Sequence, residues 1–89
     1  MADRGALEAS LEHHGVPKHL RQGLIDYVIH GQRPGGFLLA CLENNFVDAV
    51  CRAIDLHVYE IVAVAKWIFN EAPSRCWGSP GIVKTWRGE

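Results

Sequence analysis

Apolar residues recur three or four positions apart along most of the chain, which is the spacing of one face of an α-helix. The first such segment covers about residues 3–13, where Leu7 and Leu11 stand four positions apart and Gly15 follows as a stop. A second covers residues 17–30 and begins with proline, a favourable residue for a first helical turn. We expect it to be covered on two sides, because its apolar residues form two stripes: Leu20, Leu24, Tyr27 and Val28 in one, Ile25 and Ile29 in the other.

The middle of the chain predicts either one interrupted helix or two short ones. Helical spacing begins at Phe37 and continues to about Ala53, but Asn44 and Asn45 fall between. Asparagine is unfavourable inside a helix and favourable at its N-cap. The pair therefore either breaks the helix or caps a successor, with Asp48 in the first turn that would follow.

The most apolar segment covers residues 56–71, with Asp55 as its expected N-cap. Little polar face remains among Leu56, Val58, Tyr59, Ile61, Val62, Val64, Ala65, Trp67, Ile68 and Phe69. A helix that is apolar nearly all round lies at the centre of a core or against another subunit. A last helix follows Ser79 as N-cap and runs to about Arg87. The short connections favour a compact all-α bundle of about five short helices.

Length and composition indicate one small domain. The chain has 89 residues, of which 48% are apolar, so apolar surface is left over that an oligomer or a partner would cover. The net charge of −1 gives no general attraction to nucleic acid or membrane. Cys41, Cys51 and Cys76 have no close pairing, and the N-terminus has no apolar signal region. We therefore expect free thiols and a cytoplasmic protein.

Two loops, residues 31–36 and 75–81, have the same make-up. Each holds an arginine, a proline and at least two glycines, and each leads into a helical segment. A helix N-terminus that opens from such a turn presents unpaired N–H groups to an anion such as phosphate. The same residues also suit a tight connection, because glycine permits positive φ and proline presets the first turn. Both interpretations stay open.

The C-terminal part adds cations and aromatic surfaces to the second loop. Residues 73–88 contain three cations, Arg75, Lys84 and Arg87, and no acid, together with Trp77 and Trp86. Such a set suits a nucleotide, with phosphate on the helix end and the base stacked on a ring. In the alternative, the tryptophans only fix the last helix to the core. The candidate ligand-binding residues are Arg33, Gly35, Gly36, Arg75, Trp77, Gly78, Ser79 and Lys84.

No catalytic or metal-binding pattern stands out. His13, His14 and His19 lie near one another but lack the close ligand pairs of zinc modules. His57 and Glu60 are spaced for proton transfer, yet they also fit a solvated stripe. A nucleophilic Cys76 would need a base, and no histidine is local in sequence, so a structural cysteine is expected there. We therefore predict no enzyme, no cofactor and no metal.

Three motifs follow one another along most of the chain. They are Pro17-x-His19-(x)3-Gly23-(x)3-Tyr27-(x)3-Gly31-x-x-Pro34-Gly35-x-Phe37-Leu38, then Glu43-Asn44-Asn45, then Ala72-Pro73-x-x-Cys76-Trp77-Gly78-Ser79. The set resembles a family of small uncharacterised proteins encoded by phages and prophages, over roughly residues 16–86. Related chains commonly read Asn-Asp where this one has Asn44-Asn45, so a charge there is not needed for the fold. We treat residues 1–15 as a variable N-terminal helix or arm and residues 16–89 as the helical core domain.

The resemblance implies a genomic context rather than an activity, so no catalytic residue carries over. Small phage proteins often act on the host by sequestering a signalling nucleotide or by masking a defence or transcription protein. We therefore expect a non-enzymatic, homo-oligomeric binding protein, a host-takeover or anti-defence factor that sequesters an anionic nucleotide-like ligand. The alternative is a protein–protein inhibitor or adaptor that masks a host protein through surface around Trp67, Trp77 and Trp86. Nucleic-acid binding is disfavoured by the near-neutral charge.

Overall fold

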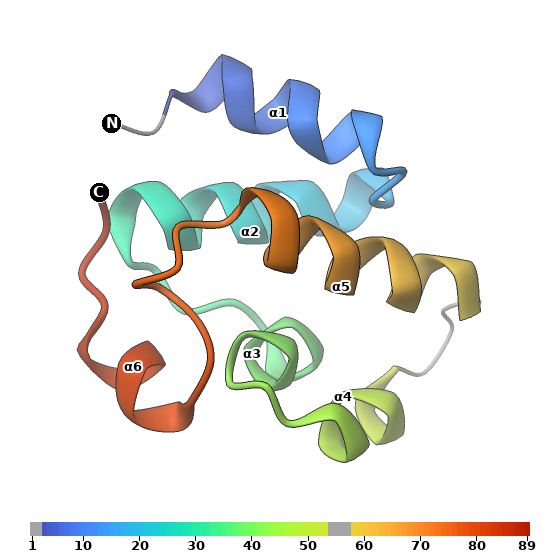
Figure 1. The fold of residues 1–89 in the computed structure, drawn as a ribbon, viewed down its shortest axis with the longest axis vertical. Coiled ribbons are helices and arrows are strands. Elements are labelled where there is room, and N and C mark those ends of the chain that lie inside the picture. Colours follow the sequence, from blue (N-terminus) through green and yellow to red (C-terminus); the bar gives the residue numbers. More distant parts are fainter. Residues whose placement is uncertain (1–2, 54–57) are drawn as a thin grey trace.

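The computed structural model describes residues 3–53 and 58–89, and these residues form α-helices and no β-strand. The longer helices, α1, α2 and α5, lie alongside one another, and the shorter α3, α4 and α6 gather on one side of them (Figure 1). The helices are α1 (Arg4–His13), α2 (Lys18–His30), α3 (Gly36–Leu42), α4 (Phe46–Arg52), α5 (Val58–Glu71) and α6 (Pro80–Thr85). The predicted all-α bundle is confirmed.

The chain turns between α3 and α4 at the two asparagines, so the middle segment is two helices rather than one. Asn44 adopts a positive φ of 61°, a left-handed conformation that asparagine tolerates better than most residues. The side chain of Asn45 then accepts a hydrogen bond from the backbone N–H of Asp48 at 3.2 Å and caps α4. The expected cap at Asp55 and the expected start at Leu56 lie outside the described residues.

The last helix is shorter than the sequence predicts, because it ends at Thr85 and not near Arg87. Trp86 leaves it in an extended conformation and donates its indole N–H to the carbonyl oxygen of Tyr27 at 2.9 Å. The backbone N–H of Glu89 donates to the carbonyl oxygen of Val28 at 3.0 Å. These two hydrogen bonds hold the C-terminal residues on the end of α2. They form because the chain after Thr85 is extended and does not continue α6.

One apolar core joins α1, α2, α3, α5, α6 and the loop before α6. Trp67 of α5 is fully buried, and its indole N–H donates to the hydroxyl of Ser10 in α1 at 2.8 Å. Leu24 and Ile25 are both fully buried, which confirms that α2 is covered on two sides. The core consists of Leu7, Leu11, Val16, Leu24, Ile25, Tyr27, Val28, Leu38, Leu42, Ala63, Val64, Trp67, Ile68, Ala72, Cys76 and Val83.

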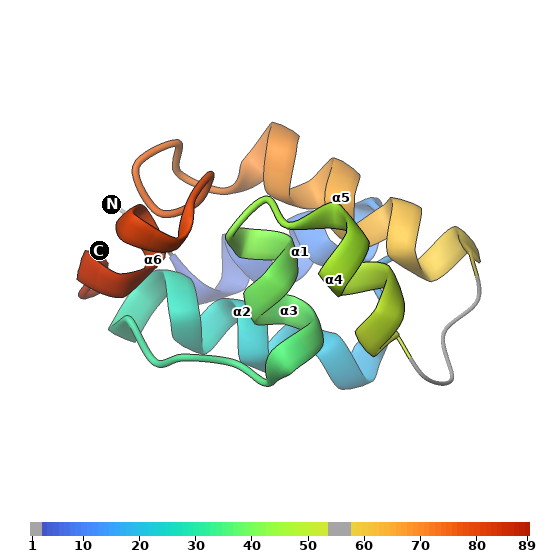
Figure 2. The ribbon, with the colours of Figure 1, turned by 90° about the horizontal axis from the view of Figure 1, so that it is seen from below.

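The α5 helix is buried on one side only, although its sequence is apolar nearly all round. Val64 and Trp67 face the core, whereas Tyr59 is 83% exposed and Phe69 is 74% exposed. The helix runs along one face of the molecule (Figure 2). Of the two positions predicted for this helix, the centre of the chain's own core is therefore wrong.

Within the part of the chain that the structure describes, no helix is both long and apolar enough to cross a membrane.

Candidate functional site

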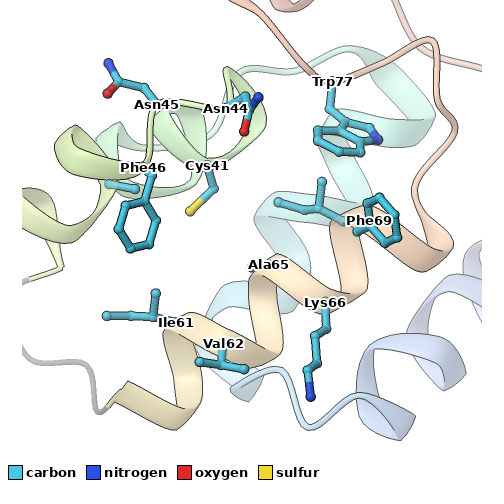
Figure 3. A pocket seen from close by; sticks show the side chains of 12 residues that line it. Cys41, Asn44, Asn45, Phe46, Ile61, Val62, Ala65, Lys66, Phe69 and Trp77 are labelled. Atoms are coloured by element: carbon cyan, nitrogen blue, oxygen red, sulfur yellow. The ribbon is translucent and has the colours of Figure 1, made fainter.

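An apolar groove of about 340 Å³ lies between α5 on one side and α3 and α4 on the other (Figure 3). This volume is at the small end of the range of ligand pockets, roughly 300–1,000 Å³. Its lining combines aliphatic and aromatic side chains with two asparagines and one lysine: Cys41, Asn44, Asn45, Phe46, Ala49, Ile61, Val62, Ala65, Lys66, Ile68, Phe69 and Trp77.

Large side chains surround this groove, and three small ones lie between them. Phe46 on α4 is 72% exposed and stands opposite Ile61 and Val62 on α5, while Trp77 lies at the other end (Figure 3). Cys41, Ala49 and Ala65 contribute little side-chain volume, which leaves the hollow between the larger residues. The shape suits bulky apolar side chains that enter from outside.

Trp77 is held in the groove by its two neighbours in the chain. The carbonyl oxygen of Cys76 accepts a hydrogen bond from the buried hydroxyl of Tyr27 at 2.6 Å. The backbone N–H of Gly78 donates to the carbonyl oxygen of Leu42 at 2.8 Å. With the backbone fixed on both sides, the Trp77 ring meets the ring of Phe69 edge to face, at 6.3 Å between centroids.

The groove carries almost no charge at neutral pH. Lys66 is its ionised side chain, and it points away from the hollow along the outer side of α5 (Figure 3). Burial raises the pKa of the Cys41 thiol to about 11, so this thiol stays protonated at neutral pH. An apolar occupant would therefore meet little desolvation cost in the groove.

Two of the predicted ligand residues, Arg33 and Lys84, come together. The guanidinium of Arg33 donates to the carbonyl oxygen of Lys84 at 3.1 Å, and the guanidinium of Arg87 donates to the same oxygen at 3.1 Å. Two guanidinium groups therefore converge at the C-terminal end of α6, on the backbone of a third cationic residue. Arg87 lies outside the predicted ligand set, although the sequence shows it among the cations of this region.

The other predicted ligand residues lie elsewhere and already have structural roles. Arg75 pairs with the carboxylate of Glu89 at 3.4 Å, and Trp77 lines the apolar groove. The Ser79 hydroxyl accepts from the N–H of Ile82 at 3.3 Å and caps α6, as expected, and Gly78 adopts a positive φ of 126°. Gly35 and Gly36 are exposed at the start of α3. Whether any of these residues binds a ligand stays a prediction.

The thiol of Cys76 behaves as a structural group. Cys76 is fully buried, and burial raises its pKa to about 11, with the charge of Glu89 adding to the effect. A thiolate nucleophile needs the opposite shift. Among the described residues, no cluster of three or more histidine, cysteine or acidic side chains is arranged for a metal ion.

The apolar spacing along the chain does not reveal the groove. Phe46 and Val50 continue the helical spacing of the middle segment and Val62 that of the most apolar one, yet all three are exposed. One signal was available in the short α4, where Phe46, Val47, Val50 and Cys51 give more apolar positions than one buried face needs.

Comparisons of the chain with protein-family models, with curated proteins and with solved structures find no match.

Proposed function

We propose that this is a non-enzymatic, phage-type binding protein that masks a host protein by docking an amphipathic helix of that protein on the apolar groove. The observation that carries the proposal is the groove itself, with small residues between large aromatic ones and no ionised group pointing into it. Helix-in-groove recognition uses apolar anchors at helical spacing that enter such a hollow. This is the inhibitor or adaptor function that the sequence left as the alternative, but its surface differs: Trp77 lines the groove, whereas Trp67 is fully buried and Trp86 lies outside the groove.

The exposure of the groove walls supports this function. Phe46 and Phe69 are 72% and 74% exposed, and exposed aromatic residues around a hollow are typical of binding surfaces. The rims of the groove add polar groups, Asn44 and Asn45 beside α4 and Lys66 on α5. A helix with apolar anchors and a carboxylate near Lys66 would complement this surface.

Photo-crosslinking in host cells tests the proposal. A photoreactive phenylalanine analogue replaces Phe46 in one protein and the exposed Ala9 of α1 in a matched control. We expect one discrete adduct with a host protein from position 46 and none from position 9. Adding Ala65→Glu to the position 46 protein places a carboxylate in the hollow. This change is expected to weaken the affinity for the partner at least about thirtyfold, or about 2 kcal/mol.

Ala65 is exposed, so the Ala65→Glu protein is expected to keep the parent's melting temperature and to report on binding alone. Ala9→Glu in the same background controls for the added charge. If position 46 yields the same adducts as position 9, or adducts of this chain with itself only, the masking function is wrong.

A second candidate, sequestration of an anionic nucleotide-like ligand, is favoured by the convergence of Arg33 and Arg87 on the carbonyl oxygen of Lys84. The three cations bear no ion pair to a described residue, whereas Arg75 is paired with Glu89. A phosphate group near them would form charge-assisted hydrogen bonds. This site keeps Arg33 and Lys84 from the predicted set and replaces Arg75 with Arg87.

Thermal-shift titration with mono-, di- and cyclic nucleotides tests this second candidate. We expect a rise in the parent's melting temperature, with Lys84→Ala weakening the affinity about tenfold, because one charge-assisted contact contributes roughly 1.5 kcal/mol or more. Lys18→Ala, which removes an exposed lysine at the start of α2, is the control and is expected to bind like the parent. No rise for the parent at millimolar nucleotide would exclude sequestration.

A further inference from the structure

The exposed side of α5 carries a regular stripe, here named the α5 stripe, of Tyr59, Val62, Lys66 and Phe69. The successive spacings are three, four and three residues, which is the a/d pattern of helices that pack side by side. Tyr59 is 83% exposed, Val62 45% and Phe69 74%. The stripe therefore has the spacing of a helix-packing seam, and its side chains remain exposed to solvent.

We propose that a second copy of this chain covers the α5 stripe, with the two α5 helices packed antiparallel in a weak symmetric dimer. Antiparallel packing pairs each a position with a d position of the other helix. With the two-fold axis at the level of Val64, Tyr59 meets Phe69 of the partner subunit, and Val62 meets Lys66 of the partner subunit. By symmetry each pairing occurs twice.

Lys66 determines the direction of this pairing. In a parallel pair the two copies of Lys66 would face each other directly, which places like charges together in a partly desolvated seam. In the antiparallel pair each Lys66 instead lays its aliphatic stem against a valine and leaves its ammonium in water. Val62 and Lys66 are thus complementary only when the helices run in opposite directions.

A small residue beside the stripe allows the two helices to approach. Ala65 is exposed and lies one residue past the level of Val64, so its methyl group leaves room for the partner helix. Two aromatic pairs, Tyr59 with Phe69 of the partner subunit, then close the two ends of the seam. Such pairs are favourable beyond the apolar area that they bury.

The area of the stripe indicates a weak dimer. At 83% and 74% exposure, and with about 200 Å² on each ring, Tyr59 and Phe69 offer about 300 Å² per copy. Val62 and the Lys66 stem bring the total for two copies to about 1,000 Å², the lower limit for a specific interface. The net charge of −1 adds little repulsion between copies. We expect a dimer that forms at high-micromolar concentration and gives way to a tighter partner.

The dimer goes beyond the proposed function and can be tested apart from it. Val62, Lys66 and Phe69 belong to both the groove and the α5 stripe, but Tyr59 belongs only to the stripe and Phe46 only to the groove. Loss of the host adduct from position 46 therefore overturns the masking function and leaves the dimer untouched. A monomer at every concentration overturns the dimer alone.

Thiol cross-linking tests the register and the direction. Tyr59→Cys and Phe69→Cys are made separately in a Cys51→Ser background, which removes the exposed native thiol. Cys41 and Cys76 remain, and burial holds the pKa of each thiol at about 11, so they react slowly at neutral pH. With a short bis-maleimide we expect the mixture of the two variants to form a covalent dimer and each variant alone to form none. Cross-linking of each variant with itself would overturn the antiparallel arrangement.

Sedimentation equilibrium up to about 1 mM measures the dimer of the full chain. We expect Tyr59→Glu to remain monomeric, and Lys66→Met to dimerise at concentrations roughly tenfold lower than the parent, because a lysine in an a position weakens a helical seam. Val47→Glu, which changes an apolar residue that is 71% exposed on α4 outside the stripe, is the matched control and is expected to dimerise like the parent. A parent that stays monomeric at the highest concentration, or equal loss in the Val47→Glu and Tyr59→Glu proteins, would overturn the proposal.

Discussion

Replacing Trp67 with alanine is expected to lower the free energy of unfolding by about 4 kcal/mol, because the change leaves a large cavity in a small core. Trp67 is fully buried, and its indole N–H donates to the Ser10 hydroxyl at 2.8 Å. The variant therefore loses apolar contacts around the ring and the hydrogen bond that holds α1 on α5. Urea unfolding followed by far-ultraviolet circular dichroism measures the loss.

Phe69→Ala is the matched control for this change. Phe69 lies two positions further along α5 but is 74% exposed, so the expected loss is below about 0.5 kcal/mol. Both variants are compared at low-micromolar protein, where the chain is monomeric under the proposed weak dimerisation. A Trp67→Ala protein as stable as the Phe69→Ala protein would show that α5 does not pack as described.

Replacing Gly31 with alanine is expected to cost about 3 kcal/mol of stability through two separate effects. Gly31 ends α2 with a φ of 71°, and an L side chain in that region costs roughly 1–2 kcal/mol. A methyl group there would also lie 2.5 to 2.8 Å from backbone atoms of Arg87, and relieving such overlap costs roughly 1–3 kcal/mol. The C-terminal residues would have to move away from the end of α2.

Gly15→Ala separates the two effects. Gly15 has nearly the same φ, 75°, but an added methyl group meets no atom within 4 Å. Its expected cost is therefore about 1 kcal/mol from the backbone conformation alone. In thermal melts of a domain of this size, Gly31→Ala should lower Tm by more than about 10 °C and Gly15→Ala by about 5 °C. Equal shifts would mean that Arg87 does not pack against Gly31.

The helices of this fold could be predicted because their signals are local. Gly15 and Gly31 follow α1 and α2 with positive φ, and Ser79 caps α6 through its hydroxyl. Asn45 caps α4 in the same way, although the sequence left open whether the middle segment was one helix or two. Each of these signals acts over three or four residues and needs no knowledge of the rest of the chain.

The candidate site could not be predicted because its parts come from distant segments. The groove joins Cys41, Phe46, Ala65 and Trp77, and nothing in their local patterns indicates that they meet. The anion site assumed at the two loops divides for the same reason, with Arg33 beside Lys84, Arg75 on Glu89 and Trp77 in the groove. The two loops have similar compositions but different neighbours in the fold, and composition alone does not distinguish an anion site from a tight connection.

The all-α class, the approximate helix limits and the apolar excess can be predicted from the residues, since periodicity, caps and composition are properties of short segments and of residue counts. Which apolar residues the core uses depends on how the helices pack. Phe46, Tyr59 and Phe69 have the same apolar character as Trp67, yet they remain exposed while Trp67 is buried. A core of this size can enclose only one side of α5, so packing geometry rather than hydrophobicity determines which apolar side chains remain for a partner.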